Sequence, residues 1–211
     1  SERMTLCNLA MFLGGITAIM ETDEITYDFL KNHHVSEWKE MRPDHDANYV
    51  KTVDIDMSEI EPVIVVPPSP ANTVKISEVI GTPIQVGYIG SWASGRVKDF
   101  QQAVELLDQK RVLDGFRLYA VPTSNEIQSE ITKMGIAAKL IDAGAQLSFP
   151  SCDFCIGQMG ALVEGEHAMT TGTLNIPGRM GSNKAKIFTG SPYSIAAAAL
   201  TGKITDPREL F

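Results

Sequence analysis

Two cysteines three residues apart are the most reactive feature of the sequence. Cys152 and Cys155 lie in the segment P-S-C-D-F-C-I-G, residues 150–157. Two thiolates at this spacing can bind one metal ion, bind one edge of an iron–sulfur cluster, or form a redox disulfide. A zinc site needs four ligands, and the sequence has no second Cys-x-x-Cys to supply them. Buried structural thiols are the alternative interpretation, because free cysteine is often a core residue.

A second segment, residues 170–181, combines hydroxyl groups, glycines and Arg179. An arginine between glycines can pair bidentately with a substrate carboxylate when it lies beside a crevice. A surface turn with a solvated arginine is the alternative. Arg179 is therefore a candidate for substrate binding.

The elements that would position these residues are three strand–turn–helix units. Their strands are expected at 86–89, 116–121 and 187–188, each followed by a turn with serine and then by an amphipathic helix. This order predicts an α/β fold with a parallel sheet. Because ligands bind at the carboxyl ends of such strands, the turn residues Ser91, Ser124 and Ser191 are expected to line one crevice. Ser191 and Pro192 are also expected to cap and begin the last helix.

The N-terminal third has a different pattern. Helical spacing predicts a first helix with Leu6, Leu9, Leu13 and Ile16 on one face. A second helix is expected after an N-cap at Thr22, with Ile25, Phe29 and Leu30 on its buried side. Alternation at Val50, Val53 and Ile55 and the apolar run 63–66 indicate strands. Prolines then favour a connector at 67–83, between a partial domain at 1–66 and an α/β domain at 84–211.

Composition excludes several classes of protein. The 211 residues carry 18 basic and 26 acidic side chains, a net charge of −8, and the basic residues are scattered. Nucleic acid and anionic membranes are therefore not expected partners.

Three cysteines are too few for a disulfide scaffold, so a reducing, cytoplasmic location is expected. The sequence has no secretion signal and starts without Met inside a helical pattern, which suggests a fragment, a processed product or a trimmed chain.

In collinear order, these segments resemble the aconitase family, and most of all its 3-isopropylmalate dehydratase and homoaconitase large subunits. The matching motifs are E-R-M-T-L-C-N-L-A at the start, the strand and turn at 86–91, the Cys-x-x-Cys loop, G-E at 165–166 with the run to Gly181, and G-K-I-T-D-P-R at 202–208.

The resemblance implies a three-layer α/β/α sandwich and a [4Fe–4S] cluster held by three cysteines, Cys152 and Cys155 being two of them. It also implies dehydration and rehydration of a hydroxy di- or tricarboxylic acid, and contact of Asn8 and Arg179 with that acid. The missing partners would be an N-terminal half and a small swivelling subunit.

Several family positions are altered here. Trp92 occupies the position of the third cluster cysteine, and Thr173 and Leu174 replace an Asn and an Arg that contact substrate in the family. An indole cannot bind iron. Two hypotheses follow: a hydro-lyase or isomerase subunit, or a divergent paralogue without a cluster that serves binding, assembly or altered chemistry. A zinc or redox role for the cysteine pair alone is a third.

Overall fold

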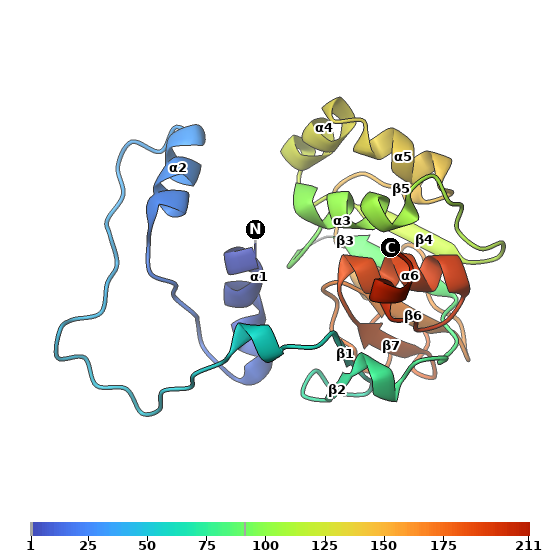
Figure 1. Ribbon diagram of the computed structural model, residues 1–211, viewed down its shortest axis with the longest axis horizontal. Helices are drawn as coiled ribbons and strands as arrows, with labels where there is room; N and C mark the ends of the chain where they lie inside the picture. Colours follow the sequence, from blue (N-terminus) through green and yellow to red (C-terminus); the bar gives the residue numbers. More distant parts are fainter. Residues whose placement is uncertain (1, 91) are drawn as a thin grey trace. The chain divides into compact units, whose positions relative to one another are not determined.

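The computed structural model describes residues 2–90 and 92–211 (Figure 1). Contacts divide the chain into two compact units. One consists of Ser1–Thr5 together with Glu61–Phe211, and the other is Leu6–Ile60.

A seven-stranded sheet organises the larger unit. Its spatial order is β2-β1-β7-β6-β3-β4-β5. Strands β7, β6, β3, β4 and β5 are parallel, whereas β1 pairs antiparallel with both β2 and β7. The strands are β1 Val63–Val65, β2 Thr73–Lys75, β3 Val86–Gly90, β4 Arg117–Val121, β5 Gln146–Leu147, β6 His167–Thr170 and β7 Lys186–Thr189. The α/β class with a largely parallel sheet is thus confirmed.

One face of the sheet is covered by four helices, α3 Val97–Leu107, α4 Asn125–Lys133, α5 Ile136–Asp142 and α6 Pro192–Thr201 (Figure 1). Their buried residues pack with the strand residues Ile89, Leu118, Met169 and Phe188 in one core. The helix α6 carries an unbroken buried run of four alanines, 196–199, which lets it lie close to the strands. At Gly87 of β3, an added Cβ would be 2.9 Å from the Ile195 side chain.

Within the described residues of this unit, the opposite face is covered by loops and a 3-10 turn, η4 Phe154–Ile156. Strand side chains that alternate with those of the helix face point here, including Val86, Tyr88 and Tyr119. Phe154, Cys155, Leu162 and Met180 complete this second core. The loop with Cys152 and Cys155 therefore packs on this second, loop-covered face of the sheet.

The three expected strand–turn–helix units are present as β3–α3, β4–α4 and β7–α6. Ser124 caps α4 by accepting a hydrogen bond from the backbone N–H of Ile127. Ser191 caps α6 in the same way through the N–H of Ser194, and Pro192 is the first residue of that helix. Each helix therefore begins just after the carboxyl end of its strand.

The expected domain boundary differs from the observed one. The run 63–66 does form a strand, β1, with Ile64 fully buried. However, the segment 67–83, expected to be a connector, contains β2 and the turn η3 Ile76–Glu78, and Ile76 is buried in the helix-face core. The sheet-bearing unit accordingly begins at Glu61, because β1 and β2 pair with the sheet.

The smaller unit holds the second half of α1 Glu2–Leu9, then η1 Ala10–Leu13, α2 Glu24–Asn32 and η2 Met57–Glu59. The first helix stops before Ile16, because Gly14 adopts a left-handed conformation. The N-cap of α2 is Asp23 and not Thr22, since the Asp23 carboxylate accepts the backbone N–H of Thr26 at 3.2 Å.

Two further expectations for this unit are wrong. Ile25 and Phe29 of α2 are exposed and none of its residues is buried. Residues 50–56 form no strand, and Val50, Val53 and Ile55 are exposed. Periodicity identified apolar faces here, but no described residue of Leu6–Ile60 covers them.

Candidate functional site

The carboxyl ends of the parallel strands form one edge of the sheet. Strands β3, β4, β6 and β7 end there at Gly90, Val121, Thr170 and Thr189. Gly90 has φ of 142°, and a Cβ added to it would be 2.0 Å from the Val121 carbonyl oxygen. Only glycine permits this close approach of the two strand ends. We call this edge, with the loops that follow it, the carboxyl edge.

The cysteine pair lies in a tight turn. Successive i to i+3 hydrogen bonds run from the N–H groups of Cys155, Ile156 and Gly157 to the carbonyls of Cys152, Asp153 and Phe154. Side chains at i and i+3 of a 3-10 turn lie one above the other, so the two thiols share one face of the turn. Cys152 is exposed, whereas Cys155 is 2% exposed and its Sγ is 3.3 Å from the Tyr88 hydroxyl.

An aromatic layer holds this turn against the sheet. The ring of Phe154 lies 4.9 Å from that of Tyr119 and stacks at 5.9 Å on that of Tyr88. Such ring pairs add stability beyond the apolar area that they bury. Tyr88 therefore both packs against the turn and contacts the buried thiol.

The cysteine turn also packs against the loop that contains Arg179. Gly157 has φ of 71°, and a Cβ there would be 2.5 Å from the Met180 carbonyl carbon. The Leu162 N–H donates to the Met180 carbonyl at 2.8 Å and fixes the two loops together. The Nε atom of Arg179 is buried and has no hydrogen-bond partner among the described residues. The structure thus brings two predicted site segments, 150–157 and 170–181, into contact.

Hydroxyl groups gather beside Gly90 at the carboxyl edge. The Gly90 N–H donates to Thr171 Oγ1 at 3.0 Å, and Ser94 Oγ donates to the Gly90 carbonyl at 3.1 Å. The Ser94 and Thr171 hydroxyls bond to each other. Thr123 Oγ1 donates to the Ser94 carbonyl at 2.7 Å. Hydroxyls of this kind can donate to carboxylate oxygens as well as accept.

Thr173 lies in the next loop, after β6. Its N–H donates to Thr170 Oγ1 at 2.9 Å, and its carbonyl accepts from Thr189 Oγ1 at 3.4 Å. Thr173 is 4% exposed, and its own hydroxyl has no partner in the described part of the chain. A buried hydroxyl without a partner is unusual and points to a group that the protein alone does not supply.

The remaining predicted site residues belong to different parts of the chain. Ser124 and Ser191 lie at the carboxyl edge, but their hydroxyls cap their helices. Ser91 lies outside the described residues. Asn8 is a residue of α1 in the smaller unit, Leu6–Ile60.

Three features mark the loop that follows β3 and the first turn of α3. Trp92 has φ of 49°, a left-handed conformation that is rare for a bulky side chain, and it is 37% exposed. Thr5, from the start of α1, donates to the Ala93 carbonyl at 2.7 Å. Burial raises the pKa of Asp99 above its usual value, although the backbone N–H groups of Arg96 and Gly95 oppose that shift.

The cysteine turn offers two thiol donors, Cys152 and Cys155, to a metal ion. No group of three His, Cys, Asp or Glu side chains suited to a metal ion is found among residues 2–90 and 92–211. Cys7, the third cysteine, belongs to the smaller unit.

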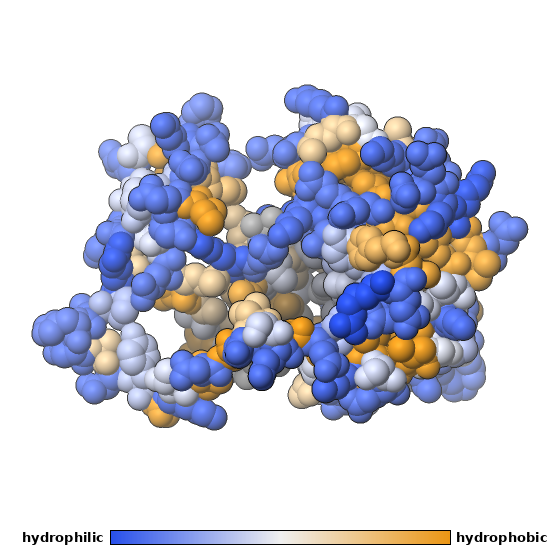
Figure 2. All heavy atoms as spheres, viewed as in Figure 1, coloured by the Kyte–Doolittle hydropathy of each residue, from blue (hydrophilic) through white to orange (hydrophobic). Residues whose placement is uncertain are grey.

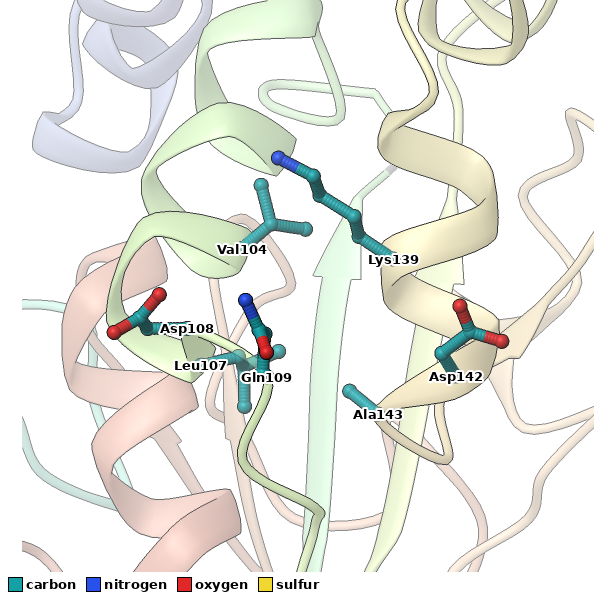
Figure 3. Close-up of a pocket in the computed structure, with 7 residues that line it drawn as sticks. All are labelled: Val104, Leu107, Asp108, Gln109, Lys139, Asp142 and Ala143. Atoms are coloured by element: carbon teal, nitrogen blue, oxygen red, sulfur yellow. The ribbon is translucent and has the colours of Figure 1, made fainter.

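A surface hollow of about 430 Å³ lies between α3 and α5, lined by Val104, Leu107, Asp108, Gln109, Lys139, Asp142 and Ala143 (Figure 3). It is formed by the carboxyl ends of these helices. Since α3 starts after the carboxyl end of β3 and runs back along the sheet, the hollow is remote from the carboxyl edge.

Sequence reasoning missed Tyr88, Ser94 and Thr171 as site residues. Tyr88 reads simply as a strand residue, and its contact with Cys155 joins positions 67 residues apart. Ser94 and Thr171 could have been found from a general signal, because each follows a parallel strand within a few residues.

None of the described helices has the length and apolar character needed to cross a membrane.

Comparisons with known proteins identify the family of the chain. A sequence model of the aconitase family (aconitate hydratase) matches residues 1–83 and 79–202. Relatives named 3-isopropylmalate dehydratase large subunit include one from Methanopyrus kandleri, 39% identical over 99% of this chain and 50% of its own length. Another from Clostridium beijerinckii is 39% identical over 98% of this chain and 49% of its own length. The chain spans about half the length of these relatives, and it belongs to the aconitase family.

Proposed function

We propose that the chain is part of an aconitase-family hydro-lyase that dehydrates and rehydrates a hydroxy di- or tricarboxylic acid. The supporting observation is the match of almost the whole chain to relatives named 3-isopropylmalate dehydratase large subunit. 3-Isopropylmalate is accordingly the first substrate to test. The missing half of the large subunit and a small subunit are the proposed partners.

The role of this chain's own residues is to bind and orient the acid. Hydroxyls of Ser94, Thr171 and Thr173 lie along the carboxyl edge, close to the starts of helices, where free N–H groups favour anions. Arg179, on the loop packed against the cysteine turn, would pair with a carboxylate. Asn8 is proposed as a further polar contact.

The family's [4Fe–4S] cluster needs three cysteine ligands. Cys152 and Cys155 would supply two of them, and Trp92 occupies the position expected for the third. The described residues offer no third side chain for a metal at this turn. The donor set therefore does not fit the family's cluster, and no catalytic step is assigned to that cluster here.

This donor set favours a second candidate function. The chain would then be a divergent paralogue that binds the acid or assembles with partners without dehydrating it. The two candidates make the same prediction for binding and opposite predictions for turnover.

One experiment separates them. The binding of 3-isopropylmalate is measured by calorimetry, and dehydration is then followed after addition of a complementary N-terminal half and a small subunit from Methanopyrus kandleri. Binding with turnover supports the hydro-lyase, and binding alone supports the paralogue. Absence of binding to the wild type, or equal binding by Thr171→Val and Arg179→Leu variants, contradicts both proposals.

A further inference from the structure

The thiol pair is the chemically distinctive feature of the sheet-bearing unit. On the helix face of this unit, hydrophobic residues are interspersed with hydrophilic ones, which is ordinary for a protein surface (Figure 2). The cysteine turn instead places two nucleophilic groups, Cys152 and Cys155, on one side of a single turn. Within residues 2–90 and 92–211, no third side chain completes a metal site at this turn. A disulfide is the chemistry that two thiols complete by themselves, because it requires no further ligand.

The backbone of the turn holds the two cysteines at a separation that a disulfide can span. The Cys155 N–H donates to the Cys152 carbonyl at 3.1 Å, so residues 152–155 form a closed four-residue turn. The Cα atoms at the two ends of such a turn are less than about 7 Å apart. A disulfide joins Cα atoms that are about 4.4–6.8 Å apart. The bond can therefore form with little movement of the backbone.

Neighbouring contacts keep the turn in this shape. The Phe154 ring, which lies between the two cysteines in sequence, packs on the rings of Tyr88 and Tyr119. Gly157, just after the turn, lies so close to the Arg179 loop that a Cβ there would be 2.5 Å from the Met180 carbonyl carbon. Folding has thus already restricted the motion that joining the two sulfurs would restrict. This raises the effective concentration of one thiol at the other and favours a bond within the pair over a bond to an external thiol.

The two thiols differ in access, as the two members of an exchange pair do. Cys152 is exposed, whereas Cys155 is 2% exposed. Redox-active cysteines are accessible and often lie beside a second cysteine that resolves the first product, so Cys152 is placed to attack and Cys155 to resolve. The Tyr88 hydroxyl lies 3.3 Å from Cys155 Sγ and can donate to a thiolate there. Tyr88 can therefore assist the release of that sulfur when a disulfide of the pair is reduced.

We propose that Cys152 and Cys155 form a site of thiol–disulfide exchange with a small thiol–disulfide couple. In the oxidising direction, the Cys152 thiolate attacks a small disulfide, forms a mixed disulfide and releases one small thiolate. The Cys155 thiolate then attacks the Cys152 sulfur, forms the 152–155 disulfide and releases the second small thiolate. Two electrons pass from the cysteine pair to the small disulfide, and the two cysteine protons end on the two small thiols. This chemistry goes beyond the proposed binding of the acid and does not depend on it.

Glutathione is the probe for the test. The full chain is equilibrated without oxygen at a series of ratios of oxidised to reduced glutathione, quenched with acid and alkylated. The peptide that contains both cysteines is then weighed by mass spectrometry. We expect a saturable loss of two hydrogen atoms from that peptide, fully reversed by dithiothreitol, and a transient glutathione adduct at Cys152 after rapid quenching. Neither acid binding nor turnover enters this readout, so its failure is distinguishable from failure of the proposed function.

Matched variants assign the roles of the two thiols. Cys155→Ser should accumulate the glutathione adduct at Cys152, because no second thiol resolves it. Cys152→Ser should slow adduct formation roughly tenfold or more, because the remaining thiol of the turn is buried. Cys7→Ser removes the third cysteine of the sequence and should behave like wild type. Circular dichroism checks the folding of each variant, and if Cys155→Ser is unfolded, the transient adduct of the wild type still identifies the attacking thiol.

Tyr88 is tested as a positioning residue. Tyr88→Phe keeps the ring and removes the hydroxyl that bonds to the buried thiol, so the equilibrium with glutathione should move roughly fivefold toward the disulfide. If Tyr88 served packing alone, the equilibrium of Tyr88→Phe would equal that of the wild type, and its assigned role in exchange would be wrong.

Three results would overturn the proposal itself. One is a folded wild type that stays fully reduced at every glutathione ratio. Another is a disulfide from Cys7 to either member of the pair in place of the 152–155 bond. The last is an undiminished rate of adduct formation at Cys155 in Cys152→Ser, because exchange would then not depend on the exposed thiol.

Discussion

The two faces of the sheet are built differently. The helix face is formed by regular elements whose apolar residues recur at helical and strand spacing, with Phe100 and Leu106 fully buried between helix and sheet. The loop face is formed by a 3-10 turn and glycine-dependent loop contacts around Tyr88 and Cys155. Regular packing thus supports the fold on one face, while irregular backbone positions reactive groups on the other.

The largest expected effect lies on the helix face. Phe100→Ala removes a ring from a fully buried position and should lower the free energy of unfolding by about 3–5 kcal/mol. Below its unfolding midpoint, the variant should still protect Cys155 from alkylation, because the thiol packs on the other face. Urea unfolding and thiol labelling measure the two properties. Fast Cys155 labelling in folded Phe100→Ala would show that the faces are not independent.

Next in size is a backbone test of the loop face. In Gly157→Ala the new Cβ would meet the Met180 and Gly181 backbone at 2.5–2.7 Å, so we expect a loss of about 2–4 kcal/mol and exposure of Cys155. Gly135→Ala is the matched control, since Gly135 also has a positive φ of 73° but open space around its Cα. Its cost should be about 1–2 kcal/mol. Equal losses in urea unfolding would mean that the loops are not in close contact.

A smaller effect concerns the two thiols. Cys152 is exposed and Cys155 is buried against Tyr88, so an alkylating reagent should label Cys152 first under native conditions. Tyr88→Phe removes the hydroxyl and keeps the ring, so we expect a loss of about 1 kcal/mol and faster labelling of Cys155. Mass spectrometry of partly labelled protein distinguishes the sites. Equal wild-type rates at Cys152 and Cys155 would contradict the described turn.

The smallest effect is a titration on the helix face. The Tyr193 hydroxyl of α6 donates to Glu105 of α3 at 2.5 Å, and this hydrogen bond, with burial and the carboxylate charge, raises the pKa of Tyr193 to about 12. A raised pKa keeps the proton in the folded state, so this contribution to stability is present below pH 10 and is lost as the pH rises toward 12. Glu105→Gln should return the pKa toward 10, measured by ultraviolet absorbance. An unchanged titration would show that Glu105 is not the cause.

The sequence predicted the helix face well. The three strand–turn–helix units, the Ser191 cap and a strand within the run 63–66 follow from local spacing and capping chemistry, and each is present. It predicted Leu6–Ile60 less well. Apolar spacing at Ile25 and Phe29 shows that a face exists, but not whether the same chain covers it.

The candidate site was only partly predictable. The cysteine turn and the Arg179 loop were identified as separate motifs, and their contact through Gly157 and Met180 depends on tertiary packing. Tyr88 could not be identified, since its partner is 67 residues away in sequence. Ser94 and Thr171 each follow a parallel strand, which is a signal in the sequence, but the bond between their hydroxyls depends on the register of β3 and β6, which periodicity alone does not give.

We propose that the carboxyl edge on the loop face is an aconitase-family site in which two cluster cysteines remain and Trp92 replaces the third. The most direct test of this proposal compares wild type with Trp92→Cys after anaerobic reconstitution with iron and sulfide, and measures bound iron and visible absorption after desalting. We predict that the wild type loses its iron, whereas Trp92→Cys retains a [4Fe–4S] spectrum that Cys155→Ser abolishes. If Trp92→Cys retains no more iron than wild type, position 92 is not at the thiol pair and the claim is wrong.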